Sequence, residues 1–187
     1  PSGVGKDSVI DGLRQLDRPW YFAVTATTRN KRETERDGED YIFLDQETFS
    51  AMRERDEFIE CAEVYGRWYG VPRSQVRKGL KSGQDVILKI DVQGAGTVRE
   101  MFPEAVSIFL IPDSLSELER RLNNRGTESA SELQVRLETA QGELTQMDKF
   151  EYRVINKDNF LGQAVTNVDA IITAEKCRMV PRLVELI

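Results

Sequence analysis

Short apolar runs alternate with amphipathic segments along most of the chain. Apolar residues recur at helical spacing over 6–16, 114–122, 132–149 and from 160 onward, and apolar runs of strand length occupy 20–26, 85–91, 106–111 and 152–155. Such alternation is typical of strand–helix–strand units, in which the strands pair in parallel. The run 106–111 is almost continuously apolar, which indicates a strand covered on both faces. The sequence therefore predicts an α/β fold with a parallel sheet.

The stretch 29–76 interrupts this alternation. It begins with a highly charged loop at 29–40. A strand at 41–44, a helix at 45–53, a second strand at 57–64 and a turn at 65–70 are predicted to follow. Asp45 can cap the helix, because an aspartate at this position accepts from the first helical N–H groups. Pro72 can begin a further helix that runs to Lys81. We interpret this stretch as an inserted subdomain.

The segment GVGK at 3–6 precedes the first helical pattern. It is the second half of the pattern G-x-x-x-x-G-K-[ST], in which backbone N–H groups and a helix N-terminus hold phosphates. Asp7 stands where Ser or Thr usually binds Mg²⁺, and Ser8 follows. A glycine-rich turn that only begins a helix is the alternative interpretation. Because a phosphate loop follows a buried strand, we expect the natural chain to have about 5–10 further apolar residues upstream, ending in Gly.

The chain of 187 residues contains no histidine. This excludes Ser-His-Asp hydrolysis, histidine-bound zinc and histidine acid–base catalysis. Phosphoryl transfer between phosphates remains possible, because its nucleophile is already an anion and Lys, Arg and Mg²⁺ neutralise the charge. With 26 basic and 32 acidic residues the net charge is −6, which argues against nucleic acid as a partner.

Two cysteines, Cys61 and Cys177, lie outside any CxxC pattern. This usage is typical of a reducing compartment and predicts a cytoplasmic protein without a disulfide framework. No apolar run approaches the roughly 20 residues that cross a membrane, so we expect no membrane partner.

Six short motifs follow one another at set distances. They are TATTR-x-x-R at 25–32, DY-x-F at 40–43, FIE-x-AE at 58–63, WYG at 68–70, IDVQG at 90–94 and RRL-x-x-RGTES at 120–129, with Arg136 beyond the last. In this order and spacing the chain resembles the guanylate kinase family, from Pro1 to about Arg178. Taken singly, each motif has an ordinary structural interpretation, such as charges on a solvated loop or helix. The whole set is specific, because the resemblance rests on all the motifs together and not on any single one.

The resemblance implies a P-loop NTPase-like three-layer sandwich with a parallel sheet, a GMP-binding insertion and a mobile lid. The implied reaction is the Mg²⁺-dependent, in-line transfer of the γ-phosphoryl group of ATP to GMP, giving ADP and GDP, in purine nucleotide metabolism. The expected core comprises 1–28, with the phosphate loop and first helix, together with 77–122 and 136–187. The expected GMP-binding insertion is 29–76, and the expected lid is 123–135.

On the ATP side, the resemblance implies binding by the phosphate loop and by one distant asparagine: Ser2, Gly3, Val4, Gly5, Lys6, Asp7, Ser8 and Asn156. It implies catalysis by the loop lysine and by arginines that reach the transferring phosphoryl group: Lys6, Arg121, Arg125 and Arg136. The implied Mg²⁺ ligands, partly through water, are Asp7 and Asp91.

On the GMP side, the resemblance implies seven residues: Thr25, Arg29, Arg32, Tyr41, Glu60, Tyr69 and Asp91. Arg29 and Arg32 would hold the phosphate with the two tyrosine hydroxyls, because guanidinium forks suit a dianion. Glu60 would recognise guanine, since a carboxylate can accept from the N1–H and the 2-amino group together. Adenine does not offer these donors in the same arrangement. Thr25 would assist at the base, and Asp91 would organise the site.

Two further positions depart from the family pattern. Lys89 stands where an acid is usual, and a lysine there can reach a phosphate or pair with a neighbouring carboxylate. Val71 stands where a small hydroxyl residue often contacts the GMP phosphate. The lost hydrogen bond is worth about 1 kcal/mol, or up to about 3 when the acceptor is charged.

Two other functions remain open at this point. One is a guanylate-kinase-like interaction module with weak or no activity, which binds a phosphopeptide in the GMP site. The other is a kinase of the same family that acts on a different phosphorylated acceptor, such as a ribose bisphosphate. The loop glycines with Lys6 and the complete set of arginines favour an enzyme, and Glu60 with Thr25 favours guanine. The sequence leaves the oligomeric state and the use of dGMP open.

Overall fold

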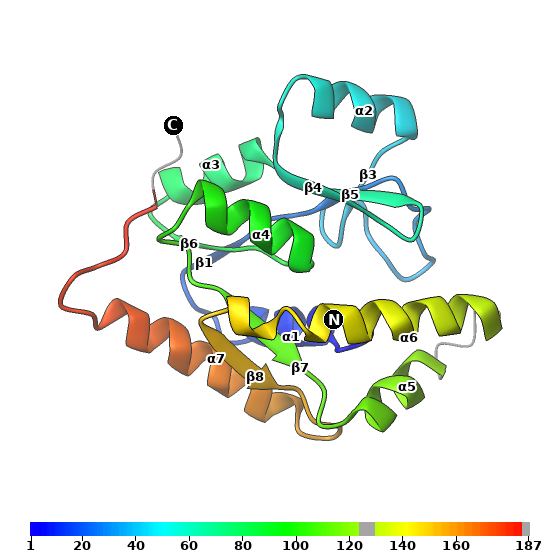
Figure 1. Ribbon diagram of the computed structural model, residues 1–187. Helices are drawn as coiled ribbons and strands as arrows, with labels where there is room; N and C mark the ends of the chain where they lie inside the picture. The colour runs from blue at the N-terminus through cyan, green and yellow to red at the C-terminus, as the bar shows by residue number, and fades with distance from the viewer. Residues whose placement is uncertain (124–129, 185–187) are drawn as a thin grey trace. The chain divides into compact units, whose positions relative to one another are not determined.

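The computed structural model describes residues 1–123 and 130–184. The chain divides into two compact units (Figure 1). The first is formed by Pro1–Arg18 with Val106–Leu183, and the second is built on Pro19–Ala105. Both contain parallel strand pairs with helices packed on them, so the α/β prediction is confirmed. The predicted division into core, insertion and lid stays a prediction.

The first unit is built on two parallel strands. Strand β7 (Ile108–Ile111) pairs with β8 (Tyr152–Ile155) from Ile108 opposite Tyr152 to Ile111 opposite Ile155. Helix α7 (Leu161–Lys176) lies along β8 and packs against α1 (Lys6–Arg14). The helix predicted at 6–16 and the strand at 152–155 are therefore confirmed. The prediction that 106–111 is covered on both faces is wrong for most of β7: Phe109 is buried, whereas Ile108, Leu110 and Ile111 are only half-buried.

Two further helices complete this unit. Helix α5 (Leu115–Asn123) begins after Ser114, whose Oγ accepts from the N–H of Glu117 at 3.2 Å. Helix α6 (Ala130–Leu144) packs on α5 through the buried residues Leu118, Leu122 and Ala140. The single helix predicted at 132–149 is interrupted: α6 ends at Leu144 and a short 3₁₀ helix, η1 (Met147–Lys149), follows.

The second unit contains the other parallel pair. Strand β1 (Trp20–Phe22) pairs with β6 (Asp85–Ile87), and α3 (Arg73–Lys81) packs on both. The strand predicted at 85–91 ends early, at Ile87. The segment that follows leads to Asp91, which caps α4 (Val92–Met101) by accepting the N–H of Gly94 at 2.8 Å.

The second unit also contains a four-stranded mixed sheet. Its order is β3 (Ile42–Phe43), β2 (Ala26–Thr27), β5 (Arg67–Pro72) and β4 (Phe58–Val64). Strands β2 and β3 are parallel, and β5 is antiparallel to both of its neighbours. The prediction of a turn over 65–70 is wrong beyond its first two residues. Tyr65 and Gly66 alone turn the chain, with φ angles of 52° and 70° that suit a tight hairpin.

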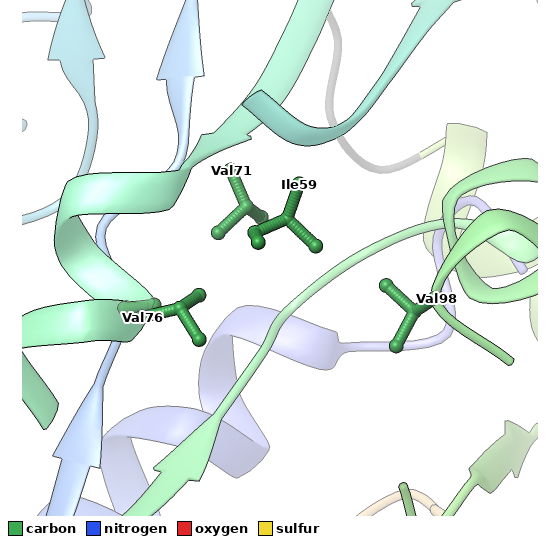
Figure 2. Close-up of a cluster of buried hydrophobic side chains, with 5 residues drawn as sticks. Ile59, Val71, Val76 and Val98 are labelled. Carbon is green, nitrogen blue, oxygen red and sulfur yellow. The ribbon is translucent and has the colours of Figure 1, made fainter. Parts of the chain in front are cut away.

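Buried aliphatic side chains join this sheet to its helices. Ile59 and Val71 from the sheet meet Val76 of α3 and Val98 of α4 in one cluster (Figure 2). Helix α2 (Gln46–Glu54), capped by Asp45 as predicted, places Phe49 in a stack on Phe58 with ring centres 4.5 Å apart. Both packing contacts hold β4, the strand that carries Glu60.

No helix in the described part of the chain is long and apolar enough to cross a lipid bilayer.

Candidate functional site

The predicted phosphate loop leads directly into α1. Gly3 and Gly5 have φ angles of 78° and 89°, a left-handed backbone that other residues adopt only with strain. Gly5 is the N-cap of α1, and no side chain in the described residues caps this helix end. Helix N-termini attract anions through their N–H groups and the helix dipole, so this geometry suits a phosphate.

The carbonyl oxygen of Val4, inside this loop, accepts from two distant side chains. Nδ2 of Asn156 donates at 2.8 Å, and Nη1 of Arg121 donates at 3.1 Å. Val4 is fully buried and Asn156 is 5% exposed. A side chain at Gly5 would not fit, because its Cβ would lie 2.5 Å from Nδ2 of Asn156. These contacts hold the loop backbone in one position.

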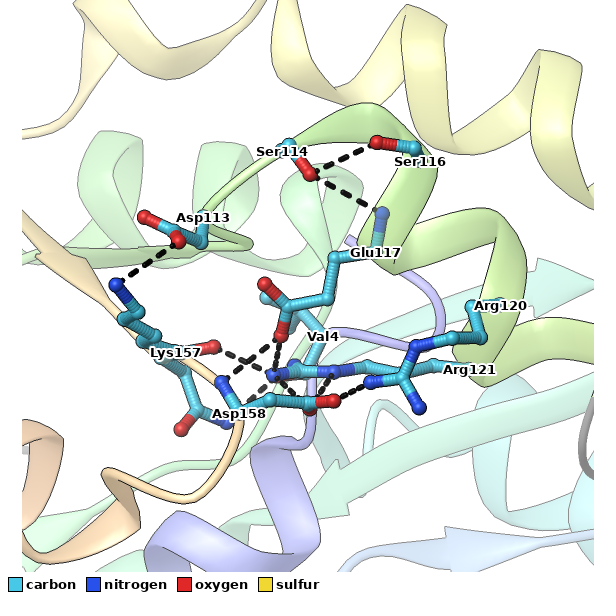
Figure 3. A network of polar contacts seen from close by, with 10 residues as sticks. Val4, Asp113, Ser114, Ser116, Glu117, Arg120, Arg121, Lys157 and Asp158 are labelled. Carbon is cyan, nitrogen blue, oxygen red and sulfur yellow. Dashed lines mark hydrogen bonds and ion pairs between the residues drawn. The ribbon is translucent and has the colours of Figure 1, made fainter.

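Carboxylates and backbone carbonyls of the protein accept hydrogen bonds from the guanidinium of Arg121 (Figure 3). Its Nε donates to Asp158 at 2.9 Å, and its Nη2 donates to the backbone carbonyl of Asn156 at 2.7 Å and to the carboxylate of Glu117. Glu117 in turn accepts from the N–H of Asp158 at 3.0 Å. The structure thus places Arg121 in a network that holds the loop. A direct role at the transferring phosphoryl group stays a prediction.

The start of the loop is tied to α6 and to Lys6. The backbone N–H of Ser2 donates to the Glu143 carboxylate at 2.8 Å, and the ammonium of Lys6 donates to the carbonyl of Pro1 at 3.1 Å. Arg136, which is half-buried, lies two helical turns before Glu143 and therefore on the same side of α6. Arg125 and residues 124–129 of the predicted lid lie outside the described residues.

Arg29 and Arg32, in the second unit, share one carboxylate. Nη1 and Nη2 of Arg29 donate to Glu35 at 2.9 and 2.7 Å, and the backbone N–H of Arg32 donates to Glu35 at 2.8 Å. The Arg32 guanidinium is 3.8 Å from the same carboxylate. Burial alone would raise the pKa of Glu35, but the hydrogen bonds from Arg29 and Arg32 outweigh it and lower that pKa. Two predicted phosphate ligands are therefore brought together by an ionised glutamate.

The ring of Tyr41 joins this cluster to other predicted GMP ligands. The Arg29 guanidinium lies 5.2 Å from the ring centre, and the Tyr69 ring lies 6.1 Å from it, edge to face. The ammonium of Lys89 lies 4.3 Å from the same ring centre. Two cations therefore contact one phenol ring, within the range of cation–π attraction.

Glu60 is a buried carboxyl on β4, only 5% exposed. Burial raises its pKa to about 8, the negative charge of Asp91 adds to the increase, and a hydrogen bond from the backbone of Val71 opposes it. A Cβ at Gly94 would collide with this carboxyl, so the first turn of α4 approaches it only because that position is glycine. Glu60 and Asp91 thus lie within electrostatic reach of each other.

Thr25 is also buried, 5% exposed, and its Oγ1 donates to the carbonyl of Lys89 at 3.5 Å. This contact joins the residues before β2 to the segment that carries Asp91. Thr25 and Asp91 therefore belong to neighbouring parts of the second unit, as expected of residues that serve one ligand.

The two predicted metal ligands differ in their surroundings. Asp7 is exposed in the first turn of α1, beside Ser8, whereas Asp91 is half-buried and uses one oxygen to cap α4. The described residues contain no group of three or more Asp, Glu or Cys side chains that could enclose a metal. Mg²⁺ usually takes one or two carboxylates and completes its shell with phosphates and water. A single carboxylate next to a phosphate loop fits that chemistry.

Sequence patterns missed the carboxylates that organise these sites. Glu35, Glu117, Glu143 and Asp158 each accept hydrogen bonds from a predicted site residue or from the loop. Glu35 and Glu117 had local signals, since Glu35 lies three residues after Arg32 and Glu117 lies four residues before Arg121 in one helix. Glu143 and Asp158 act across long stretches of chain, where spacing carries no information.

Known proteins are similar to this chain in sequence and in fold. A sequence model of the family described as guanylate kinase matches residues 1–175. The guanylate kinase of Halalkalibacterium halodurans is 46% identical over 185 residues, which cover 99% of this chain and 89% of that protein. That of Caldanaerobacter subterraneus subsp. tengcongensis is 45% identical over 179 residues, covering 96% and 86%. The crystal structure of guanylate kinase from Anaplasma phagocytophilum matches with a TM-score of 0.78 and 31% identity, covering 93% of this chain and 84% of that one.

Proposed function

The chain belongs to the guanylate kinase family, and we propose that it transfers the γ-phosphoryl group of ATP to GMP, giving ADP and GDP. The observation that carries this function is the presence, in one compact unit, of a buried carboxyl at Glu60 and a two-arginine cluster at Arg29 and Arg32. The carboxyl suits a base that donates two hydrogen bonds, and the arginines suit a phosphate. GMP has both features.

Glu60 recognises the guanine base. With a pKa of about 8, the free carboxyl is mostly protonated at pH 7. Guanine donates from N1–H and the 2-amino group, so it favours the ionised carboxylate, and binding releases the proton. Adenine lacks this donor pair and would leave a buried group without its hydrogen bonds, which is the source of selectivity. Thr25 assists at the base.

The acceptor phosphate binds to Arg29 and Arg32, with the hydroxyls of Tyr41 and Tyr69. The guanidinium groups provide paired N–H donors in the planar arrangement that phosphate oxygens accept. Asp91 organises this part of the site by holding the start of α4.

The donor phosphates bind at residues 2–8, because the backbone N–H groups at the start of α1 and the positive charge of Lys6 favour an anion. Arg121 and Asn156 act as positioning residues, since both hold the carbonyl of Val4. Asp7 follows Lys6 directly, which puts a metal-binding carboxylate next to this loop.

In the transfer step, an oxygen of the GMP phosphate attacks the γ-phosphorus as the bond to the β,γ-bridging oxygen breaks and ADP leaves with the electron pair. No general base is required, because the attacking oxygen is already anionic. The loop lysine and three arginines offset the charge on the phosphoryl group: Lys6, Arg121, Arg125 and Arg136. Asp7 and Asp91, partly through water, would hold the Mg²⁺ that neutralises the ATP phosphates.

The assay is ADP release with GMP, AMP, CMP or UMP as acceptor. Of the four acceptors, GMP alone should be used rapidly. Glu60→Gln should lower kcat/KM for GMP by a factor equivalent to about 2–4 kcal/mol, and kcat/KM for AMP should change far less. Equal losses for both nucleotides would give Glu60 a structural role. Tight GMP binding without any turnover would instead identify the interaction module, which no observation on the described residues favours.

We also propose that the enzyme works in the cytoplasm, in purine nucleotide metabolism. Its two cysteines, Cys61 and Cys177, are both free thiols, which suits a reducing compartment. Its acidic net charge of −6 does not suit a nucleic-acid partner.

A further inference from the structure

Lys89 follows the strand β6, two residues before Asp91, and the function proposed above gives it no task. We infer that Lys89 is a third cationic ligand of the acceptor phosphate, beside Arg29 and Arg32. The inference deepens the proposed function and rests on it, because it concerns the same GMP site.

The position of the Lys89 ammonium supports this role. It lies 4.3 Å from the centre of the Tyr41 ring, and the Arg29 guanidinium lies 5.2 Å from the same centre. The carbonyl of Lys89 lies 3.5 Å from the Thr25 hydroxyl, at the outer limit of a hydrogen bond. The lysine therefore lies among predicted GMP ligands, and its ammonium contacts the ring of a tyrosine expected to bind the phosphate.

The charge of the arginine cluster leaves a phosphate incompletely neutralised. Arg29 and Arg32 carry two positive charges, but the ionised carboxylate of Glu35 cancels one of them. A phosphate monoester carries close to two negative charges at neutral pH. Lys89 adds a third cation, beside the Tyr41 ring, and a further positive charge there favours a dianionic ligand.

The chemistry of lysine suits a group that must move a short distance. Its ammonium is a point charge on a flexible four-carbon stem, whereas an arginine fork is planar and rigid. A charge-assisted hydrogen bond to a phosphate oxygen is stronger than contact with a phenol face. When GMP binds, the ammonium shifts from the face of Tyr41 to a phosphate oxygen.

A purely structural role for Lys89 predicts a different pattern of binding. If the ammonium only supports the Tyr41 ring, then its loss loosens the pocket for any nucleoside. If it binds phosphate, then its loss weakens only ligands that carry a phosphate. GMP and guanosine, which share the base and ribose, separate these two roles.

The experiment is calorimetric titration of the intact chain with GMP and with guanosine. Lys89→Gln should weaken GMP binding about tenfold or more, equivalent to about 1.4 kcal/mol, and leave guanosine binding within about twofold. Lys89→Arg should retain most of the GMP affinity, because it keeps the charge. The matched control is Lys78→Gln, since Lys78 lies 5.8 Å from the centre of the Tyr21 ring in the same unit. It should change neither affinity.

Equal weakening of GMP and guanosine, or no weakening of GMP, would overturn the inference. If Lys89→Gln does not fold, Lys89→Met keeps the apolar stem and is measured in its place. Failure of the parent chain to bind or phosphorylate GMP is a separate outcome that rejects the proposed function itself.

Discussion

Arg29 donates both terminal nitrogens of its guanidinium to the two carboxylate oxygens of Glu35, at 2.9 and 2.7 Å. This pairing leaves Arg29 with a fixed orientation and a reduced effective charge. The backbone N–H of Arg32 binds the same carboxylate, so one residue outside the predicted site sets the geometry of two residues within it.

Glu35→Gln should lower the free energy of unfolding by about 1 kcal/mol at pH 7, because three N–H donors lose an ionic acceptor. The pKa of Glu35 is lowered in the folded chain, so its contribution is present above its ordinary value of 4.5 and is lost as the pH falls through the folded value. Urea unfolding at several pH values should show the difference shrinking in acid. The control is Glu39→Gln, whose partner Arg36 is exposed, and it should change little.

Binding of guanosine should release about one proton per site near pH 7. Free Glu60 has a pKa of about 8, and the guanine donors require its ionised form. Guanosine has no phosphate, so the proton can be assigned to the base site. Calorimetry in buffers of different ionisation enthalpy measures the release. It should disappear above about pH 9, where the free carboxyl is already ionised, and a constant enthalpy across buffers at pH 7 would contradict it.

Glu60→Gln should make the chain more stable than its parent at high pH. The folded pKa of about 8 exceeds the ordinary value of 4.5, so the folded chain binds more protons between these values and its stability falls as the pH rises through them. Glutamine cannot ionise, and the variant should gain roughly 3–5 kcal/mol relative to the parent between pH 5 and pH 9. Parallel pH profiles of the two unfolding free energies would show that Glu60 does not titrate with folding.

Asn156→Ala should raise the KM for ATP roughly 5- to 150-fold, equivalent to about 1–3 kcal/mol, because a buried carbonyl loses one of its donors. GMP affinity measured without ATP should not change. Asn156→Asp should be worse than alanine, since a carboxylate would face the carbonyl of Val4. The control is Asn167→Ala on an exposed part of α7, where the side chain accepts from Gln163. A loss of GMP affinity as large as the loss for ATP would indicate general destabilisation.

Asp7→Ala should increase the Mg²⁺ concentration needed for half-maximal rate and lower kcat. A carboxylate is a good Mg²⁺ ligand, and attraction to the metal should exceed its repulsion from the phosphates, with Lys6 offsetting part of that repulsion. The measurement is a Mg²⁺ titration at fixed ATP and GMP. A variant that is faster than its parent, with an unchanged Mg²⁺ dependence, would identify Asp7 as an inhibitory charge.

Local signals in the sequence were enough to predict most of the fold. The cap at Asp45 placed α2, and the apolar run at 152–155 placed β8, because both depend on residues close in the chain. Strand β5 was missed because Gly66 and Gly70 suggested a longer turn. The aromatic residues Trp68 and Tyr69 pair across to β4 instead, and only Tyr65 and Gly66 bend the chain.

The organisation of the candidate site could be predicted only in part. The resemblance to a family supplied Arg29, Arg32 and Glu60, but not the contacts that set their charge and orientation. The hydrogen bond between Arg121 and Val4 joins residues 117 positions apart, and no periodicity reports such a contact. The raised pKa of Glu60 likewise arises from burial, which depends on the packing of α4 at Gly94.

The carbonyl of Val4 joins the loop to α5 and to the segment after β8, because it accepts from Arg121 and from Asn156. These hydrogen bonds order the loop backbone without help from a nucleotide. Triphosphate binding therefore loses little entropy to freezing the loop, and more of the phosphate attraction appears as affinity. A mutation that removes one of the hydrogen bonds to this carbonyl would weaken ATP binding even if the mutated residue does not itself contact ATP.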